Sequence, residues 1–487
     1  MIAFFAAASL ALSSPEAWAP PPSEVLTAEQ VATDLALMEE TLERVHPGYE
    51  RYASPDELEA AWDALRAATA KGSDQLSFYR EISEFLTAIR CEHTKGELPN
   101  DLKGPEREGR YRFPARFQAF GNRLFIDSAP EGSPFRRGDE ILSINGVRTK
   151  AIVKTLIRHV SYDGYTDYSR RRSLETDGDL FASGFERFFP LVYGYSERFE
   201  VRLRRPGDGR KTVSAGAITQ AEWNALPWGR LEKKADFPDS ITVAYPAEGV
   251  GYLRVASFVN YRRPVSPAAV LDPVFEEFEQ KGVETLIIDL RENGGGSEDA
   301  ERGLFRRLIR EPFQPVSRQY RKTLDFEGLR EAVGTWDESA INPQPERWTL
   351  AGNGFGYERV GDARRPVVEP HPKAFGGDIV VLSSEHNASA STFLLRKLQE
   401  QPHVTVLGDR TGGNVGGTTA GVLVFLTLPE SGVVVRVPLF RYSAVVEGAR
   451  DGYGVEPDVF VPETLKAFRA GRDIQLERAV ALAAAGR

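Results

Sequence analysis

A short apolar run that ends in a cluster of glycines constrains the fold of this chain more than any other feature. Residues 286–290 are apolar except for Asp289, and glycines occupy all of positions 294–296. A continuous apolar segment bounded by turn residues is typical of a strand buried on both faces of a parallel sheet. Glycine lets backbone N–H groups point into a cleft without obstruction by a side chain. The run therefore predicts a buried strand whose end forms either an oxyanion hole or a tight turn into a helix.

Further candidate strands alternate with helical stretches over residues 240–462. The strands are expected at residues 250–255, 285–290, 379–382, 404–407, 422–428 and 433–437. This alternation favours an α/β fold in which helices cover a layered sheet. We therefore expect the largest domain over residues 240–462 and a helical tail over residues 463–487.

Two regions of different texture precede this block. Residues 24–105 predict an N-terminal helical domain, because Thr27 and Gln30 form a capping-box pattern and Ser54-Pro55 marks a second helix start. Residues 110–218 carry short β-like runs instead. Within them, residues 160–195 are rich in Tyr, Arg and Phe and are expected to form either a lid over a cleft or a structural insertion.

The start of the chain predicts export. An apolar run of about twelve residues is too short to span a bilayer, and Ala17-Trp18-Ala19 follows it as a cleavage-like site. Residues 1–19 are therefore expected to be a signal peptide, with a buried or disordered N-terminus as the alternative. No second apolar run reaches the length of a membrane span. We expect a periplasmic or secreted protein without a membrane span.

Composition excludes several classes of function. The 61 Lys and Arg against 70 Asp and Glu give a formal charge of −9, which argues against a nucleic-acid partner. Cys91 is the only cysteine, so neither a disulfide nor a Cys-rich zinc site is expected. The six histidines include no H-E-x-x-H pair. The prediction is therefore no metal and no cofactor, while Cys91 is either a buried small side chain or a reactive thiol.

A serine-rich turn carries the candidate nucleophile. Residues 387–393 follow the expected strand 379–382 and precede leucines at helical spacing. A serine at such a turn lies at a helix N-terminus, where the helix dipole favours developing negative charge. N-capping is the competing explanation, because Ser and Asn are frequent caps. Three other candidate segments are the Gly-rich loop 408–417, the His93-Thr94 pair, and the acidic Gly-rich turn 447–458.

Together and in this order, these motifs resemble those of the tail-specific, or C-terminal-processing, serine peptidases and their tricorn-core relatives. The matching patterns are D-L-R-x-N-x-G-G at 289–296, S-A-S at 389–391, G-x-x-T-x-G at 408–413, G-[VI]-x-P-D at 454–458 and H-T at 93–94. A G-D-x-I-L-x-I-N-G run at 138–146 resembles a PDZ domain, which this family often carries. The resemblance covers roughly residues 28–462. It implies a crotonase-like core over 240–462 and a PDZ-like domain over 110–218.

The resemblance also implies the roles of individual residues. Ser389 would be the nucleophile, and the backbone N–H groups of Ala390 and Gly295 would form the oxyanion hole. The remaining residues expected to contact substrate are Gly294, Gly296, Thr411, Gly412, Gly413 and Asn414.

The base departs from one branch of the family. In the Ser–Lys branch a lysine stands 25 residues after the nucleophile, where this chain has Asn414. The tricorn-like branch uses histidine, so the resemblance makes His93 the base. Histidine suits this role because its pKa lies near neutrality. The supporting acid is either Glu447 or Asp451, and the sequence leaves this choice open.

The predicted function is that of a serine endopeptidase. It would hydrolyse unstructured or C-terminal segments of proteins through an acyl-enzyme on Ser389. The alternatives are a non-catalytic peptide-binding scaffold that keeps the fold, and a crotonase-type acyl-CoA enzyme. The PDZ-like domain would either present substrate C-termini by strand addition or serve only for packing. Nothing in the sequence indicates an oligomeric state.

Overall fold

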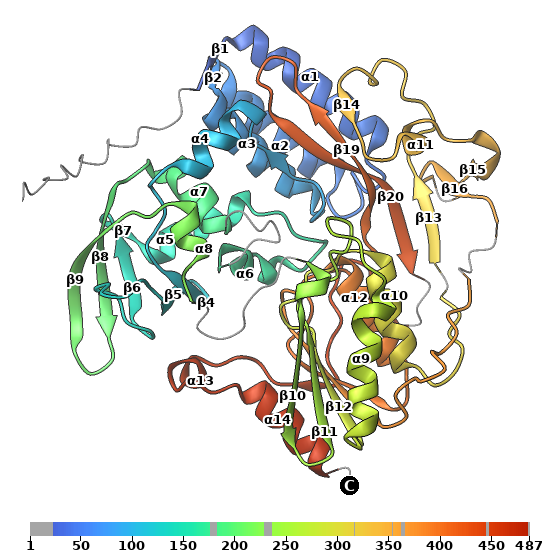
Figure 1. The fold of residues 1–487 in the computed structure, drawn as a ribbon. Coiled ribbons are helices and arrows are strands. Elements are labelled where there is room, and N and C mark those ends of the chain that lie inside the picture. The colour runs from blue at the N-terminus through green and yellow to red at the C-terminus, as the bar shows by residue number, and fades with distance from the viewer. Residues whose placement is uncertain are drawn as a thin grey trace, which may run out of the picture.

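The computed structural model describes residues 23–175, 183–227, 236–315, 317–352, 354–361, 366–444 and 448–485. The predicted signal peptide at 1–19 lies outside these residues. The described chain forms three larger sheets and a set of helices that cover them (Figure 1). None of the helices in these ranges is both long and apolar enough to cross a membrane.

The first large sheet is mostly parallel. Its strands, in spatial order, are β10 (Ile241–Ala247), β11 (Val250–Val255), β12 (Thr285–Asp289), β17 (Asp378–Ser383), β18 (Val404–Gly408) and β21 (Val459–Phe460). Only the β10–β11 pair is antiparallel. Every residue of β12 is buried, which confirms the strand expected from the apolar run. Its carboxyl end, and that of β17, open onto the turns that carry the candidate site.

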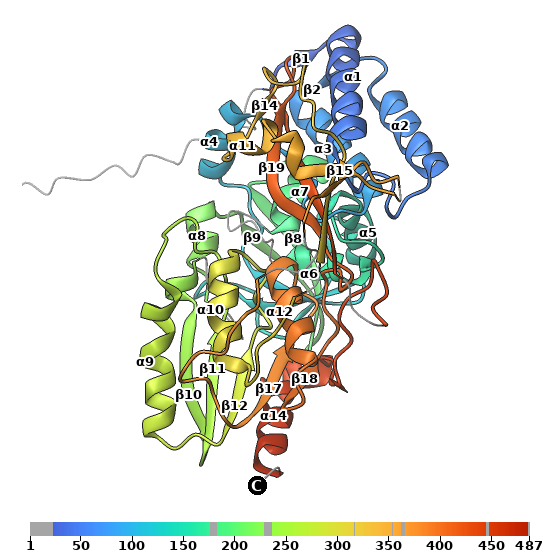
Figure 2. The same cartoon turned by 90° about the vertical axis from the view of Figure 1, so that its right-hand side faces the viewer.

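Helices cover both faces of this sheet (Figure 2). One face packs against α9 (Pro267–Gln280), α10 (Glu298–Leu308) and α12 (Ser389–Gln399). The other face packs against α14 (Ile474–Ala485), which follows α13 (Leu465–Arg469). Burial on both sides explains why the central residues of β12 and β17 are all apolar rather than alternating with polar ones.

The last two expected strands lie in a different sheet. β19 (Thr419–Thr427) and β20 (Val434–Ala444) pair with each other in an antiparallel sheet. The other strands of this sheet are β14 (Val333–Gly334), β13 (Ser317–Arg321), β16 (Tyr357–Arg359), β15 (Trp348–Leu350) and β3 (Gly96–Glu97). The two apolar runs form strands where the sequence predicts them. The strands that pair with them, including β3, come from distant segments of the chain.

The N-terminal helices are α1 (Ala28–Val45), α2 (Pro55–Thr69), α3 (Gln75–Leu86) and the shorter α4 (Asn100–Glu108). The first two begin where the sequence predicts. Both capping boxes, at Thr27 and Ser54, are confirmed. A two-stranded sheet of β1 (Val25–Leu26) and β2 (Ser73–Asp74) joins the segments. These helices lie beside β19 and β20 (Figure 1) and share one apolar core with them.

The third large sheet lies between residues 116 and 216. Its strands are β4 (Arg116–Phe120), β5 (Arg123–Ser128), β6 (Glu140–Ile144), β8 (Arg198–Arg205) and β9 (Gly209–Gly216), with β7 (Val147–Arg148) beside β6. The helices of this region are α5 (Thr149–Leu156), α6 (Arg170–Glu175), α7 (Gly184–Tyr193) and α8 (Gln220–Asn224). The apolar side chains of this sheet join the same core as the N-terminal helices. The helical and β-rich regions are therefore packed together rather than separated.

A buried ion pair attaches the C-terminal segment to the parallel sheet. Asp289, at the end of β12, accepts hydrogen bonds from the Arg291 guanidinium at 3.0 and 2.6 Å. Arg291 also pairs with Asp473, just before α14, at 2.7 Å. Burial alone would raise the pKa of Asp289, but Arg291 lowers it below its usual range. The carboxylate therefore stays ionised at neutral pH.

Replacing Asp289 by asparagine is expected to lower the free energy of unfolding by about 3 to 5 kcal/mol, because it leaves a buried guanidinium short of its counter-charge. Urea denaturation measures this change. Glu477→Gln is the control, since it removes an exposed ion pair with Arg472 and should leave the unfolding midpoint unchanged. Equal effects of the two substitutions would contradict the assignment of the buried pair.

Candidate active site

Ser389 occupies a strained turn between β17 and α12. It is the first residue of α12 and has a φ of 49°. Among the described residues, only Arg90, Asn145 and Ser389 are non-glycines with positive φ. Asn145 lies in an Asn-Gly hairpin turn and Arg90 caps a short helix at its C-terminus, and both are ordinary positions for this conformation. Neither reason applies to Ser389, and such strain concentrates at functional sites.

Asn387 holds this turn against the end of β12. Its Nδ2 donates to the carbonyl oxygens of Leu290 and Asn293 at 2.6 and 3.1 Å. Its Oδ1 accepts from Ser384 N at 2.7 Å, and its own carbonyl accepts from Gly413 N at 2.8 Å. Asn387 is completely buried, whereas Ser389 is half-buried. The serine is therefore held rigidly by its neighbour while its own side chain keeps access to solvent.

The glycine turn after β12 packs directly on this serine. A Cβ at Gly295 would lie 2.9 Å from both Ala388 O and Ser389 Cβ, and the φ of Gly295 is 104°. A Cβ at Gly296 would lie 2.3 Å from the carbonyl carbon of Phe258. At Gly294 the nearest atom would be His386 O, at 3.9 Å. The three glycines thus differ sharply in how much room surrounds them.

The two predicted oxyanion donors differ in their hydrogen bonding. Gly295 N–H donates to Asn293 Oδ1 at 2.8 Å. Ala390 is the second residue of α12, where backbone N–H groups have no acceptor within the helix. Both N–H groups lie beside Ser389. Only the N–H of Ala390 is at a helix position that has no acceptor within the helix. Their role in binding an oxyanion stays a prediction.

Replacing Gly295 by alanine is expected to reduce turnover by about 100-fold or more, because the new Cβ displaces the turn by which an oxyanion donor is aligned. Gly334→Ala, on β14 of the sheet that contains β19 and β20, is the control and should keep nearly full activity, since a Cβ there has no atom within 4 Å. Hydrolysis of casein measures both. Loss of activity in both variants, or in neither, would contradict this account of the turn.

The Gly-rich loop after β18 also packs against the turn of Ser389. A Cβ at Gly413 would lie 2.4 Å from Thr392 Oγ1 and 2.9 Å from Ala388 Cα, and one at Gly412 would lie 2.4 Å from Glu385 O. The Thr411 side chain is buried, accepting from Val455 N at 2.9 Å and donating to the carbonyl oxygen of Gly413. This loop therefore supports the turn of Ser389, and its contact with substrate stays a prediction.

Asn414, at the position of the family's lysine, is engaged in a buried network. Its Nδ2 donates to Tyr52 Oη, Gly417 O and Asp451 Oδ1 at 2.5, 2.7 and 3.0 Å. Its Oδ1 accepts from the backbone N–H groups of Gly416 and Gly452, both at 2.8 Å. Because these bonds use the donors and the acceptor of the amide, the side chain holds the loop in place.

Asp451, one of the two acids expected beside His93, lies in the same network instead. It pairs with the buried Arg51 guanidinium at 2.5 Å and accepts from Tyr52 Oη at 3.1 Å. Burial would raise the pKa of Asp451, but Arg51 keeps it below its usual range. No hydrogen bond to His93 is formed by Asp451 in the described chain. The other expected acid, Glu447, lies outside the described residues.

The carboxylate that does lie beside His93 belongs to Asp163. Thr418 Oγ1 contacts His93 Nδ1 and Asp163 Oδ2, each at 3.4 Å. Asp163 Oδ1 accepts from Glu92 N at 2.9 Å, and the side chain is buried. Burial lowers the pKa of His93, and the charge of Asp163 opposes that shift. His93 is therefore neutral at pH 7, which is the state that can accept a proton.

A second buried histidine supports this segment. His46 contacts Thr94 Oγ1 through Nε2 at 2.7 Å, and Gly48 N donates to its Nδ1 at 3.1 Å. Burial lowers the pKa of His46 to about 3, so the ring is neutral and Nε2 carries the proton. The hydrogen bond to Thr94 fixes the residue that follows His93.

Segment 160–195 brings Asp163 to the site. Thr166 Oγ1 donates to Gly412 O, and Tyr168 Oη donates to Thr411 O, both at 2.6 Å. Tyr165 N donates to Gly452 O at 2.7 Å. The described part of the segment is thus joined to the Gly-rich loop by several hydrogen bonds. Sequence analysis missed Asp163, because a single aspartate 70 positions from His93 carries no local signal.

The loop that follows β18 also connects the two halves of the candidate site. Gly413 lies against the turn of Ser389, and Thr418 lies against His93. Within the described residues, no hydrogen bond joins Ser389 directly to His93. Catalytic hydrogen bonds are often long without substrate and tighten in the complex. The turn of Ser389 and His93 therefore both contact the loop that follows β18, but in the described residues no hydrogen bond joins Ser389 to His93.

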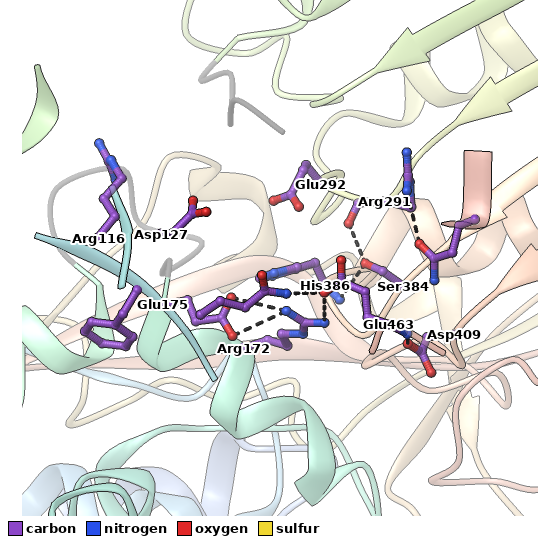
Figure 3. Close-up of a pocket in the computed structure, with 13 residues that line it drawn as sticks. Arg116, Asp127, Arg172, Glu175, Arg291, Glu292, Ser384, His386, Asp409 and Glu463 are labelled. Atoms are coloured by element: carbon purple, nitrogen blue, oxygen red, sulfur yellow. Dashed lines mark hydrogen bonds and ion pairs between the residues drawn. The ribbon is translucent and has the colours of Figure 1, made fainter. Parts of the chain in front are cut away.

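A polar cleft lies next to this turn, between β4 and the carboxyl ends of the parallel strands (Figure 3). Ser384 and His386, from the segment before Ser389, line it. Arg172 reaches across it from α6 and pairs with Glu175 at 3.3 Å and Glu463 at 2.9 Å. Three parts of the chain therefore come together at this charged cleft. They are segment 160–195, the C-terminal region and the segment that leads to Ser389.

Comparison with known proteins agrees with the order of motifs. Residues 249–461 match the model of the family described as Peptidase family S41. A carboxyl-terminal-processing protease of Synechocystis sp. is 24% identical over 245 residues, which are 50% of this chain and 45% of that protein. The chain thus matches less than half the length of this curated relative.

Two solved structures resemble the whole chain. Mature CPAF complexed with lactacystin superposes with a TM-score of 0.60 at 17% identity, covering 94% of this chain and 98% of that one. Mature CPAF alone superposes with a TM-score of 0.56 at 18% identity, covering 91% and 94%. At this level of identity the likeness shows a shared fold.

Proposed function

We propose that this protein is a serine endopeptidase acting on unstructured or C-terminal segments of proteins, because residues 249–461 match the model of peptidase family S41. The observation that carries the proposal is the positive φ of Ser389 at the N-terminus of α12. This half-buried serine lies between the glycine turn after β12 and the Gly-rich loop after β18. Metal or cofactor chemistry has no part in the proposed reaction.

The proposed reaction runs through an acyl-enzyme. Ser389 Oγ attacks the peptide carbonyl carbon, and His93 takes its proton and passes it to the leaving amine. Water then hydrolyses the ester by the reverse sequence. Ala390 N–H and Gly295 N–H stabilise the oxyanion, for which Gly295 N–H must turn from Asn293 Oδ1 to the substrate oxygen. Closure of the site brings His93 within hydrogen-bond reach of Ser389.

We propose Asp163 as the carboxylate that supports His93. It is buried, close to the imidazole and held by Glu92 N, whereas Asp451 is committed to Arg51. A carboxylate at this place orients the imidazole and stabilises the imidazolium that forms during attack. Glu447 remains the other candidate for this role.

The remaining parts of the chain have proposed roles as well. Residues 240–462 correspond to a crotonase-like core and residues 110–218 to a PDZ-like domain, which would present substrate segments by strand addition. The leader at 1–19 would direct the protein to the periplasm or outside the cell. The competing proposal is a peptide-binding scaffold that keeps this fold without catalysis.

Fluorophosphonate labelling tests the proposed activity. Such a reagent phosphonylates only a serine activated by a base and an oxyanion hole, with loss of fluoride, so the folded protein should be labelled on Ser389 and the heat-denatured protein should not. Peptide mass spectrometry identifies the labelled residue. A folded protein that resists labelling, or a label on another serine, would overturn the proposal and favour the scaffold.

A further inference from the structure

Three side chains of different chemistry converge beside the candidate base. Cys91 and His93 lie two positions apart on the segment after α3, and Asp163 approaches from segment 160–195. One ligand atom from each, the thiol sulfur, an imidazole nitrogen and a carboxylate oxygen, lies within 4.8 Å of the other two. Sulfur, nitrogen and oxygen ligands of these types are those that zinc prefers.

We propose that Cys91, His93 and Asp163 form a binding site for a thiophilic divalent cation such as Zn²⁺, and that occupancy of this site switches the peptidase off. The proposed binding of a cation depends only on the geometry of these three side chains. The switching part rests on the proposed function, because it requires His93 to be the base for Ser389.

The geometry of the cluster suits a tetrahedral ion. Zinc bonds of about 2.0 to 2.3 Å place neighbouring ligand atoms about 3.3 to 3.7 Å apart. The cluster is within 4.8 Å, so a contraction of about 1 Å, within the reach of side-chain rotation, closes it. Three protein ligands leave a fourth position for water. His93 is half-buried and provides the side from which an ion can enter.

The surroundings also suit a bound ion. Asp163 Oδ1 is held by Glu92 N at 2.9 Å, while Oδ2 makes a long contact of 3.4 Å with Thr418 Oγ1, which a metal ion could displace. Cys91 Sγ makes a weak contact, at 3.5 Å, with Thr419 O, and hydrogen bonds from Thr94 and from the backbone of His93 and Thr94 favour its thiolate form. A thiolate and a carboxylate together balance the charge of a divalent cation. On binding, the thiol proton leaves to solvent, a metal–sulfur bond forms, and no electrons are transferred.

Metal binding would remove the base whichever imidazole nitrogen is used. If Nε2 binds the ion, its lone pair is no longer available to the Ser389 proton. If Nδ1 binds, the neutral ring carries its proton on Nε2, which then cannot accept another. Asp163 is withdrawn from its supporting role in either case. The ion would therefore inhibit without touching Ser389.

Titration of the full chain with Co²⁺ tests the site directly. The expected result is one cobalt per chain with a thiolate charge-transfer absorption, displaced by one equivalent of Zn²⁺. In Cys91→Ser the absorption should vanish and zinc affinity should fall by at least about 100-fold. His371→Ala, which alters a surface histidine, should bind as the wild type does. The same absorption in Cys91→Ser, or no binding by the wild type, would overturn the site.

Casein hydrolysis tests the switch separately. Zn²⁺ should inhibit the wild type, EDTA should restore its activity, and Cys91→Ser should keep its basal activity but resist inhibition. Thermal melting of Cys91→Ser confirms that the variant is folded. Cobalt binding without inhibition would overturn the switch and leave the site. Cobalt binding to a chain that cleaves nothing and resists fluorophosphonate would instead overturn the proposed function.

Discussion

Replacing Ser389 by alanine is expected to lower kcat on casein by about five to six orders of magnitude, which is the loss seen when a serine nucleophile is removed from a peptidase. The hydroxyl is the only group in the proposed mechanism that forms a covalent bond to substrate. The oxyanion hole and the binding surface would remain, so a small residual rate above that of water is expected. Steady-state hydrolysis of casein at a known concentration of folded protein measures the change.

Ser391→Ala is the matched control for this substitution. Ser391 lies two residues further along α12, is fully buried, and accepts a hydrogen bond from Asn387 Nδ2 at 3.1 Å. Its loss should reduce turnover less than tenfold, because the serine does not reach the reacting atoms. Retention of more than about one hundredth of the activity in Ser389→Ala would rule out this nucleophile.

Replacing Asp163 by asparagine is expected to lower kcat by about three to four orders of magnitude while leaving KM nearly unchanged. The amide cannot hold the imidazole in the orientation and tautomer that accept the serine proton, nor stabilise the imidazolium. Substrate contacts are unaffected, since Asp163 is buried behind His93. The rate of fluorophosphonate labelling should fall in parallel with kcat, while thermal melting shows that the variant is folded and so separates this effect from loss of structure.

Asp451→Asn distinguishes the two carboxylates. This substitution removes the counter-charge of Arg51, whose side chain is only 2% exposed, so the melting temperature should fall. The kcat of the folded variant should stay close to that of the wild type. The opposite pattern, with Asp451→Asn inactive and Asp163→Asn active, would return the supporting role to Asp451.

The substitution of Asp163 also tests how the two halves of the site are connected. Asp163 belongs to segment 160–195, which is joined to the Gly-rich loop through Thr166 and Tyr168. The same loop contacts the turn of Ser389 through Gly413. Changes at this segment are therefore expected to reach both halves of the site, even though it lies outside the family-matched region 249–461.

Local features of the structure followed from the sequence. The buried strand β12, the capping boxes at Thr27 and Ser54, and the strand-to-helix turn at Ser389 all match what neighbouring residues predict. In each case the deciding interactions join residues a few positions apart: apolar periodicity, a side chain on a nearby N–H, or a turn that needs a small residue. Such information is contained in a short window of sequence.

The contacts between distant segments were decided only by the tertiary structure. The sequence left Glu447 and Asp451 as the candidate acids, yet the carboxylate beside His93 comes from Asp163, and Asp451 is held by Arg51. Likewise, β19 and β20 lie outside the parallel sheet: they pair with each other, and β20 also pairs with β3 near the N-terminus. Periodicity and motif order report what each segment becomes, but not which segments share a face once all apolar surfaces are buried together. Order along the chain thus determined the elements and the turn of Ser389, while packing of the whole chain decided which charges surround His93.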